Sequence, residues 1–513
     1  MRRIGRPALG KYPDLDITEF EYKEAATARC ASLRTIPKNW SSATYRPTPP
    51  GLKAQSGLKR HAGVFHLWAL GVGAVISGDF FGWNFGLLSG GFGGLLTALG
   101  IMTVLYVCLC FSIAEMSPAL PHAGGAYSFA RTALGPWCGF ITGLAENIEY
   151  IFTPAVIVVG IGGYLGDIFH TPPAYAPLWW LLCYVVFVSL NILGVAVSFG
   201  VSAAVSICAL TVLAVFCVAA IPHFDLHRWA LEGGPWLPKG WPGVFASLPF
   251  ALWVYLGIEQ LPLAAEESND PARSMPKGIL SALFTLIVFA FAVITLNTGI
   301  APGAAGIGKS NEPLSLGFRT IFGDGIEAKL LALVACTGLV ASFHAIIYAY
   351  GRQIYSLARA GYFPYWLCAT HSTRKTPHRA LITGAVLGFA TALAVQYLPH
   401  DSAVAGVLLN MAVFGAVIAY VFQMLSFLLL RVRHASIARP FVSPLGIAGA
   451  VAAIVISTIT LLALFLNPDY RPGAWGALVW FACGLLYFAF YARKRLIRSP
   501  EEEFAIRHAA VPR

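Results

Sequence analysis

Charged residues are scarce in this chain. Of its 513 residues, 12% are Asp, Glu, Lys or Arg, whereas 57% are hydrophobic. A soluble domain usually has about 25% charged residues. The composition therefore excludes an ordinary soluble protein and indicates a chain that is largely embedded in a membrane.

Motifs of enzymes and metal proteins are also lacking. The ten cysteines include no Cys-x-x-Cys pair, and no His and carboxylate residues have metal-ligand spacing. No Gly-x-Ser-x-Gly nucleophile elbow occurs, and we expect no Walker-type phosphate loop. The sequence predicts no enzyme, no cofactor and no ATP-driven pump.

The amino terminus does not have the pattern of a signal peptide. Residues 1–60 are polar, with scattered Lys and Arg and no short apolar core before a cleavage site. We interpret them as a polar cytoplasmic tail. A membrane domain is expected at 61–495, and a second cytoplasmic tail at 496–513.

Long apolar segments are what the chain has in abundance. A helix of about 20 apolar residues crosses a bilayer, and such runs recur between residues 65 and 492. Twelve spans are predicted, at 65–88, 93–114, 136–165, 177–197, 200–221, 244–264, 277–300, 328–350, 380–398, 403–430, 445–466 and 472–492.

The basic residues predict the orientation of these spans. With an even number of spans, both termini lie on one side of the membrane. If that side is the cytoplasm, only six of the 35 Lys and Arg residues fall on the other side, namely Arg228, Lys239, Lys309, Arg319, Lys329 and Arg471. This bias is the positive-inside pattern, so we expect a multi-pass protein of the cell (inner) membrane. The net charge of +11 then reflects topology and requires no nucleic-acid partner.

Two spans carry an acidic residue close to glycine at mid-depth. The first contains GVGAVISGDFFGWNFGL (71–87), with Asp79 next to Gly78, and the sixth contains SLPFALWVYLGIEQLPLAAEE (247–267), with Glu259 near Gly257. Spans five apart cross the membrane in opposite directions, which is typical of inverted-repeat transporters. We predict an all-α membrane protein in which repeat one is about 61–221, repeat two is about 244–430, and extra helices follow at about 443–492.

Glycine beside a polar residue favours an opened helix at these two places. Opened backbone must face a cavity or ligand, because lipid cannot satisfy its polar groups. We therefore predict a substrate site with Ser77, Gly78 and Asp79 on one wall and Gly257 and Glu259 on the other. Glycine can instead serve close helix packing, and we favour that alternative for Gly82 and Gly86.

Three stretches resemble loops of the amino acid–polyamine–organocation transporters. They are EMSPALPHAGGAYSFARTALGPW (115–137), LAAEESNDPARSMPKGI (263–279) and YGRQIYSLARAGYFP (350–364). The resemblance covers roughly residues 60–495. It implies secondary transport by a LeuT-type 5+5 inverted repeat with broken helices 1 and 6.

Within this family the chain is most similar to bacterial ethanolamine permeases. The stretches that carry this similarity are ISGDFFGWNFGL (76–87), GLAENIEYIFTPAVIVVGIGGYL (143–165) and ASFHAIIYAYGRQIYSLARAGYFP (341–364). Two departures from the family's amino-acid transporters matter. Residues 76–80 replace their usual Gly-Ser-Gly-Ile-Phe, and residues 200–221 lack the Lys that many proton-coupled members carry in span 5.

The acidic residues favour a cationic substrate without a carboxylate. Two unit charges 4 Å apart interact by roughly 4 kcal/mol at an effective dielectric of about 20, so Asp79 would repel a substrate carboxylate and attract an ammonium. Glu146 and Glu149 share a helix face in span 3, and Tyr150 adjoins them. No Lys or Arg lies deep in any predicted span, so these acids and Glu259 have no obvious cationic partner.

Other polar and aromatic residues have weaker predicted roles. Phe80 and Trp253 could hold an ammonium over their rings. Glu266 and Glu267 are expected to pair with basic residues such as Arg273 or Arg359 at a cytoplasmic gate. The remaining residues assigned to gating or structural loops are Arg352 and Glu115. His344 could relay protons, or it could hydrogen-bond between helices.

We predict a secondary active transporter that imports a small organic amine, in first place ethanolamine, by alternating access. The nearer alternative is an amino-acid or polyamine permease of the same fold. A membrane sensor without transport is a distant alternative. The coupling ion (H⁺ or Na⁺), the exchange mode and the oligomeric state stay open.

Overall fold

The structure is a computed structural model that describes residues 45–46, 57–310, 312–323, 326–396, 404–466 and 470–509. The predicted tail 1–60 therefore lies almost wholly outside the described residues. Every main element is a helix, and the two β-bridges that occur are isolated, joining Arg46 to Ile497 and Ala62 to Ser268.

The helices follow one another with few long connections. Those of the first half are α2 (Val64–Val75), α3 (Ser77–Phe80), α4 (Phe85–Ala119), α5 (Gly125–Leu134), α6 (Pro136–Phe169), α7 (Ala176–Leu193) and α8 (Val195–Ala220). Those of the second half are α9 (Gly240–Trp253), the 3₁₀ helix η6 (Ile258–Glu267), α10 (Pro271–Thr298), α11 (Gly303–Lys309), α12 (Pro313–Phe322), α13 (Ile326–Arg359), α14 (His378–Gln396) and α15 (Val404–Arg433). The last are α16 (Gly446–Leu466), α17 (Arg471–Phe490), the short η9 (Ala492–Arg495) and α18 (Pro500–Ala509).

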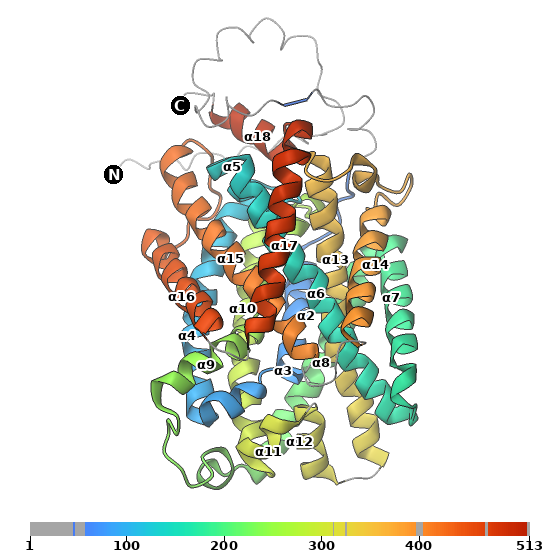
Figure 1. Cartoon of the computed structure of the whole chain (residues 1–513), viewed down its shortest axis with the longest axis vertical. Helices are drawn as coiled ribbons and strands as arrows, with labels where there is room; N and C mark the ends of the chain where they lie inside the picture. The colour runs from blue at the N-terminus through green and yellow to red at the C-terminus, as the bar shows by residue number, and fades with distance from the viewer. Residues whose placement is uncertain are drawn as a thin grey trace, which may run out of the picture.

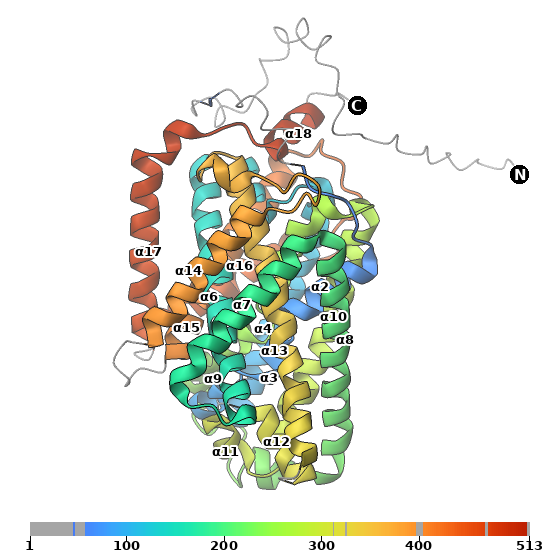
Figure 2. The same ribbon diagram turned by 90° about the vertical axis from the view of Figure 1, so that its right-hand side faces the viewer.

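The long helices form an elongated bundle. Figure 1 places α5 and α18 at one end, which we call the α18 end, and α11 and α12 at the opposite end, which we call the α11 end. In Figure 2, α17 stands at the edge of the bundle, where it packs on α6 and α15. The interior is made by α4 against α9, by α6 against α13 and α15, and by α2 against α8 and α10.

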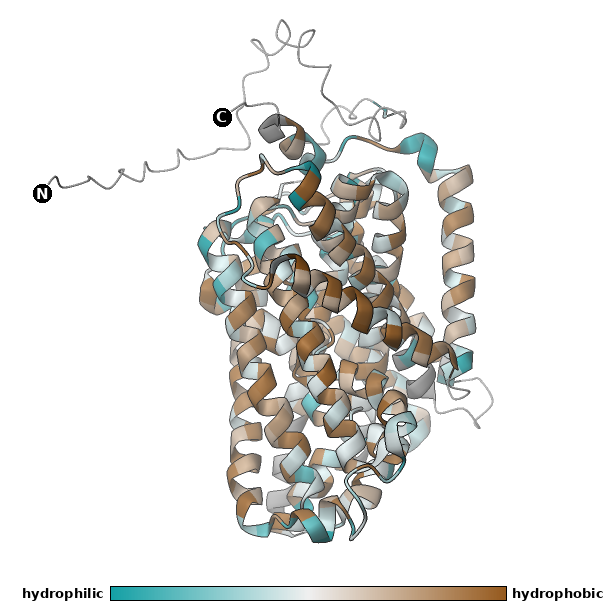
Figure 3. Ribbon diagram, turned by 90° about the vertical axis from the view of Figure 1, so that its left-hand side faces the viewer, coloured by the Kyte–Doolittle hydropathy of each residue, from teal (hydrophilic) through white to brown (hydrophobic). Residues whose placement is uncertain are grey.

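The surface of the bundle is apolar along its length. Figure 3 shows hydrophobic ribbon through the middle of the molecule and hydrophilic residues concentrated toward its two ends. Within the described residues, nine helices are long and apolar enough to cross a membrane, and Val64–Phe80 and His378–Ala394 form shorter apolar helices. The prediction of an all-helical, multi-pass membrane protein is confirmed.

Glycine and proline set several helix boundaries. Gly135 has φ 95° and ends α5, and Pro136 begins α6 at a position where its missing N–H is harmless. The predicted gap between the fourth and fifth spans, at 198–199, is wrong. Gly194, with φ 145°, separates α7 from α8, because a conformation that only glycine adopts easily turns the chain there.

Candidate substrate-binding site

The first predicted span is interrupted after Phe80, at the end of the short turn α3. Helix α2 stops at Val75, α3 occupies Ser77–Phe80, and Phe81 is extended with φ −160° and ψ 150°. The predicted opening at Ser77 and Gly78 is therefore displaced, since both residues are helical. Ile76 keeps helical dihedral angles, φ −57° and ψ −23°, and its N–H donates to Val72, so the backbone leaves the helix only after Phe80.

Position 78 requires glycine because α3 packs directly against the backbone at the end of α9. A Cβ added to Gly78 would lie 2.8 Å from Cα of Val254 and 2.9 Å from the carbonyl oxygen of Trp253. Trp253 is the last residue of α9 and Val254 follows it, where the sixth span is itself interrupted. The two broken helices thus contact each other at their breaks.

Trp253 holds the first span open after Phe80. Its Nε1 donates to the carbonyl oxygen of Phe81 at 3.0 Å, and its ring covers Gly82, whose φ is 96°. The indole N–H satisfies a carbonyl that the interrupted helix leaves exposed. Phe80 points elsewhere and packs its ring against Gly338 of α13.

The break of the sixth span is at Gly257, as predicted. Gly257 is left-handed, with φ 106°, and separates α9 from η6. Its N–H donates to both carboxylate oxygens of Glu259, at 3.1 Å each. Glu259 therefore caps the break of its own helix, a contact that the sequence did not predict.

Asp79 is buried at the first break without a side-chain partner. Asp79 is 1% exposed. Among the described residues, neither of its carboxylate oxygens has a hydrogen-bond partner. Only its backbone is bound, with its N–H donating to Ile76 and its carbonyl accepting from Trp83 Nε1 at 3.2 Å. Ser77 instead donates to Ser342 of α13 at 2.9 Å.

The two glutamates of α6 have different surroundings. Glu146 Oε2 accepts from the backbone N–H of Tyr127 at 3.1 Å and from Gln353 Nε2 at 2.7 Å. Glu149 is equally buried, yet neither of its oxygens has a hydrogen-bond partner in the described part of the chain. The described residues give Glu146 and Glu259 neutral hydrogen-bond donors and no Lys or Arg partner.

Some polar residues of the interior were missed in the sequence. Gln260 and Gln423 are buried, and within the described ranges both ends of each amide lack a partner. The hydroxyl groups of Tyr106 and Tyr420 lie 2.9 Å apart, which links α4 to α15. Amide side chains inside apolar spans are costly and by default functional, so this signal was available for the two glutamines.

All ten predicted binding residues are buried, including Tyr150, whose hydroxyl also lacks a partner among the described atoms. The structure thus presents a conformation in which solvent reaches the site from neither end. Within the described residues, no hydrogen bond joins Asp79 to the glutamates of α6 or to Glu259. The site has two acidic walls that are held separately.

Ion pairs close the α18 end beneath the site. Arg359 Nη2 lies 3.0 Å from Glu266 Oε2, and Arg352 Nη2 lies 3.0 Å from Glu267 Oε1. Arg273, offered as an alternative partner, pairs with Asp270 at 3.9 Å instead. These pairs join η6 to α13, the two elements that flank the site on this side.

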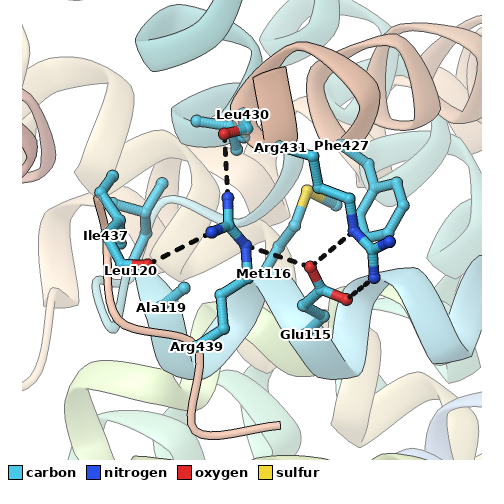
Figure 4. A pocket seen from close by; sticks show the side chains of 9 residues that line it. All are labelled: Glu115, Met116, Ala119, Leu120, Phe427, Leu430, Arg431, Ile437 and Arg439. Atoms are coloured by element: carbon cyan, nitrogen blue, oxygen red, sulfur yellow. Dashed lines mark hydrogen bonds and ion pairs between the residues drawn. The ribbon is translucent and has the colours of Figure 1, made fainter. Parts of the chain in front are cut away.

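Glu115 lies at the same end between two arginines of the α15 region. Figure 4 shows its carboxylate contacting Arg431 and Arg439, at 2.5 and 3.1 Å. Its Oε2 also accepts from the N–H of Ser443 at 2.7 Å. These contacts fasten α4 to α15 and to the loop that follows it.

His344 is held between helices. Its ring nitrogens lie 3.2 Å from Asn191 Nδ2 and from Ser198 Oγ, and Nε2 lies 3.0 Å from the carbonyl oxygen of Ser198. These contacts connect α13 to α7 and α8. They favour hydrogen bonding between helices over a proton relay.

One sequence pattern contradicts an expectation stated above. Residues 303–310, GAAGIGKS, have the spacing of a Walker-type phosphate loop. That loop follows a strand and precedes a helix, whereas here the residues form helix α11 after a helical span, and Glu232 accepts from the N–H of Ala305 at 2.8 Å. The match carries no nucleotide site. In the described part of the chain, no group of three His, Cys, Asp or Glu residues is placed to hold a metal ion.

Comparison with known proteins assigns the architecture to a family. The model of the amino acid permease family matches residues 66–495. This chain belongs to that family. The permease is 30% identical over 437 residues to an uncharacterized transporter of Rhizobium meliloti (strain 1021), an alignment that covers 82% of this chain and 89% of that protein.

Two relatives from Bacillus subtilis (strain 168) have named substrates. The branched-chain amino acid permease BcaP is 27% identical over 465 residues, covering 86% of this permease and 94% of BcaP. A methylthioribose transporter is 27% identical over 479 residues, covering 88% of this permease and 98% of that protein. The chain is a transporter of this family and not an enzyme.

Proposed function

We propose that this permease imports a small organic amine, with ethanolamine as the first candidate, and that the amine binds at Asp79. The observation that carries the proposal is the Asp79 carboxylate, which is buried with no hydrogen-bond partner among the described residues. An ionised carboxylate away from water is very costly unless a cation is beside it. A substrate ammonium supplies that cation.

The same carboxylate disfavours a substrate that carries its own carboxylate. At about 4 Å and an effective dielectric of about 20, the repulsion between two unit charges is roughly 4 kcal/mol. An amino alcohol has the ammonium and lacks the second charge. Trp253 lies at the same break, where its indole donates to the carbonyl oxygen of Phe81, and it provides an apolar wall beside the carboxylate.

Glu149 is the second acidic candidate. Its oxygens lack hydrogen-bond partners in the described residues, whereas Glu146 is bonded to Tyr127 and Gln353, and Glu259 to Gly257. We assign Glu149, with Tyr150, to the cavity and the other two glutamates to support of the surrounding backbone. In this proposal Glu149 is the glutamate that meets the cation.

We infer that transport proceeds by alternating access in a twelve-span, LeuT-type 5+5 repeat. In this arrangement α2 with α3, and α9 with η6, are the corresponding broken helices, and binding at their breaks is expected for such transporters. The positive-inside bias assigns the α18 end to the cytoplasm. The Arg359–Glu266 and Arg352–Glu267 pairs would then be parts of the cytoplasmic gate.

An amino-acid or polyamine permease is the second candidate. The name of the relative BcaP supports it, since that protein is a branched-chain amino acid permease. For an amino acid to bind at the first break, Asp79 would have to be protonated or turned away from the substrate carboxylate. A polyamine has no carboxylate, so Asp79 would not repel it. A polyamine is distinguished from ethanolamine by its greater length.

The test is uptake of labelled ethanolamine into proteoliposomes by the wild type, Asp79→Asn and Asp270→Asn. Asp270 is a matched control because it is an exposed carboxylate at the surface. We expect uptake by the wild type and the control, a loss of at least about 100-fold in Asp79→Asn from the missing ion pair, and no competition from leucine, alanine or putrescine.

Strong competition by leucine or alanine, together with transport by Asp79→Asn, would refute the proposal and favour the amino-acid permease. Strong competition by putrescine, together with loss of activity in Asp79→Asn, would indicate that the substrate is a polyamine. Saturable binding without flux would favour a sensor.

A further inference from the structure

The carboxyl-terminal segment does not trail away from the bundle. After η9 the chain turns across the α18 end, and α18 lies beside α5 (Figure 1). The N–H of Ile497 donates to the carbonyl oxygen of Ala360 at 3.2 Å, and the N–H of Arg46 donates to that of Leu496 at 2.8 Å. Segments from both ends of the chain are thus bonded to each other and to the loop after α13.

A buried ion pair anchors this segment to α5. Arg131 Nη2 lies 2.9 Å from Glu502 Oε2, and the two side chains are 0% and 2% exposed. The same guanidinium donates to the carbonyl oxygens of Ile497 at 2.6 Å and Ala360 at 3.2 Å. Removal of one partner from such a pair leaves an uncompensated buried charge, which is strongly unfavourable.

Tyr45 completes the surroundings of Glu502. Its hydroxyl donates to Glu502 Oε1 at 2.9 Å. Burial and the Glu502 carboxylate raise the pKa of Tyr45 to about 12, so this phenol is a neutral donor at physiological pH. The short described segment 45–46 therefore also holds α18 in place.

Glu501 connects the same helix to the gate residues. It accepts from the hydroxyl of Tyr127 at 2.8 Å. Burial raises the pKa of Glu501, but Arg359 and then His122 lower it further, so that the net pKa lies below the ordinary value. Arg359 is also the partner of Glu266. One arginine therefore serves both the gate beneath the site and the carboxyl-terminal helix.

The elements beneath α18 are those that would separate to open the site. Tyr127 of α5 donates its N–H to Glu146, and its hydroxyl also donates to the carbonyl oxygen of Ser356 in α13 at 3.2 Å. Ser356 in turn donates to the carbonyl oxygen of Ala123, just before α5. A Cβ on Gly124 would lie 2.7 Å from Glu501 Oε1. The start of α5 is thus in close contact with Glu501 while α18 is docked.

We propose that residues 496–509 are an intramolecular latch that holds the α18 end closed, and that α5 and η6 open only when α18 leaves them. The proposal rests on the proposed function in that opening at this end would release substrate to the cytoplasm. It adds a regulatory device that the transport mechanism by itself does not require.

Hydrogen–deuterium exchange of the full-length protein in lipid nanodiscs, without substrate, tests the latch. The variants are Glu501→Gln/Glu502→Gln, Tyr127→Phe and Glu503→Gln. Glu503→Gln is the matched control, since it makes the same chemical change on the same helix at a partly exposed residue. Tyr127→Phe removes one hydroxyl and keeps every charge, so it remains informative if the double variant fails to fold.

We expect amides at 124–134 and 258–267 to exchange at least about tenfold faster in the double variant, because local opening sets the exchange rate. In Tyr127→Phe the same segments should accelerate about 2–5-fold, since only the contacts of one hydroxyl, with Glu501 and Ser356, are lost. The α11 end should keep wild-type rates, and Glu503→Gln should accelerate these segments less than the double variant does, because Glu503 is only partly buried.

Wild-type exchange at 124–134 and 258–267 in both variants would overturn the proposal. Equal acceleration at both ends of the bundle would overturn it as well, since it would indicate general destabilisation. Because no substrate is present, these outcomes do not depend on whether ethanolamine is transported.

Discussion

Alanine at Gly257 should destabilise the permease through its backbone conformation alone. Gly257 has φ 106°, and a left-handed conformation costs an L-residue roughly 1–2 kcal/mol. The nearest atom to an added Cβ is the carbonyl oxygen of Ala74 at 3.5 Å, an ordinary contact. Steric crowding therefore adds little, and the reduced freedom of the unfolded chain offsets about 0.4–1 kcal/mol.

The net loss for Gly257→Ala is about 1 kcal/mol. Each kcal/mol shifts Tm by about 2–4 °C in domains of 150–250 residues, and we expect a fall of about that size. Gly257→Asn should lose less, because asparagine tolerates the left-handed region, and Gly257→Val should lose more, because its side chain is branched at Cβ.

Two other glycines provide the comparison. A Cβ on Gly163 in α6 meets nothing within 4 Å, so Gly163→Ala should stabilise by about 0.5–1 kcal/mol. Gly78→Ala would press on the backbone of Trp253 and Val254 and should cost about 1–3 kcal/mol. The assay is thermal unfolding of purified protein in detergent. If Gly257→Ala raises Tm as Gly163→Ala does, the left-handed break at Gly257 is refuted.

Two further predictions concern single contacts. Trp253→Phe leaves the buried carbonyl of Phe81 without its donor, so the free energy of unfolding should fall by about 1–3 kcal/mol. Trp241→Phe, at an exposed residue, should change it little, and equal effects would argue against this hydrogen bond. The pKa of Glu501 is depressed below its ordinary 4.5, so its stabilisation is present above pH 4.5 and lost as pH falls through the lower folded value. The Tm difference between wild type and Glu501→Gln should therefore be constant above pH 4.5 and shrink below it. A difference that grew on acidification would contradict the assignment.

The sequence predicted a feature of the site where that feature depends on the residue type at a single position. Gly257 was placed correctly because a left-handed break needs glycine. The break after Phe80 was missed, since phenylalanine carries no such signal and Phe81 is extended where its carbonyl oxygen accepts from the distant Trp253.

Partners that are distant in the chain could not be predicted. The hydrogen bond from Gln353 to Glu146 could not be predicted, because the two residues are 207 positions apart and meet only in the fold. The pairing of Arg131 with Glu502 joins α5 to a segment that was expected to be a simple tail. Burial of both side chains depends on the path of the chain after α17, which hydropathy does not encode.

The contact between the two broken helices has a mechanical consequence. Since Gly78 leaves no room for even a methyl group between α3 and the backbone after α9, displacement of either break must displace the other. The contact couples the two broken helices in every motion that brings them closer. Reporters placed on α3 and on the end of α9 should therefore respond together when either helix moves toward the other.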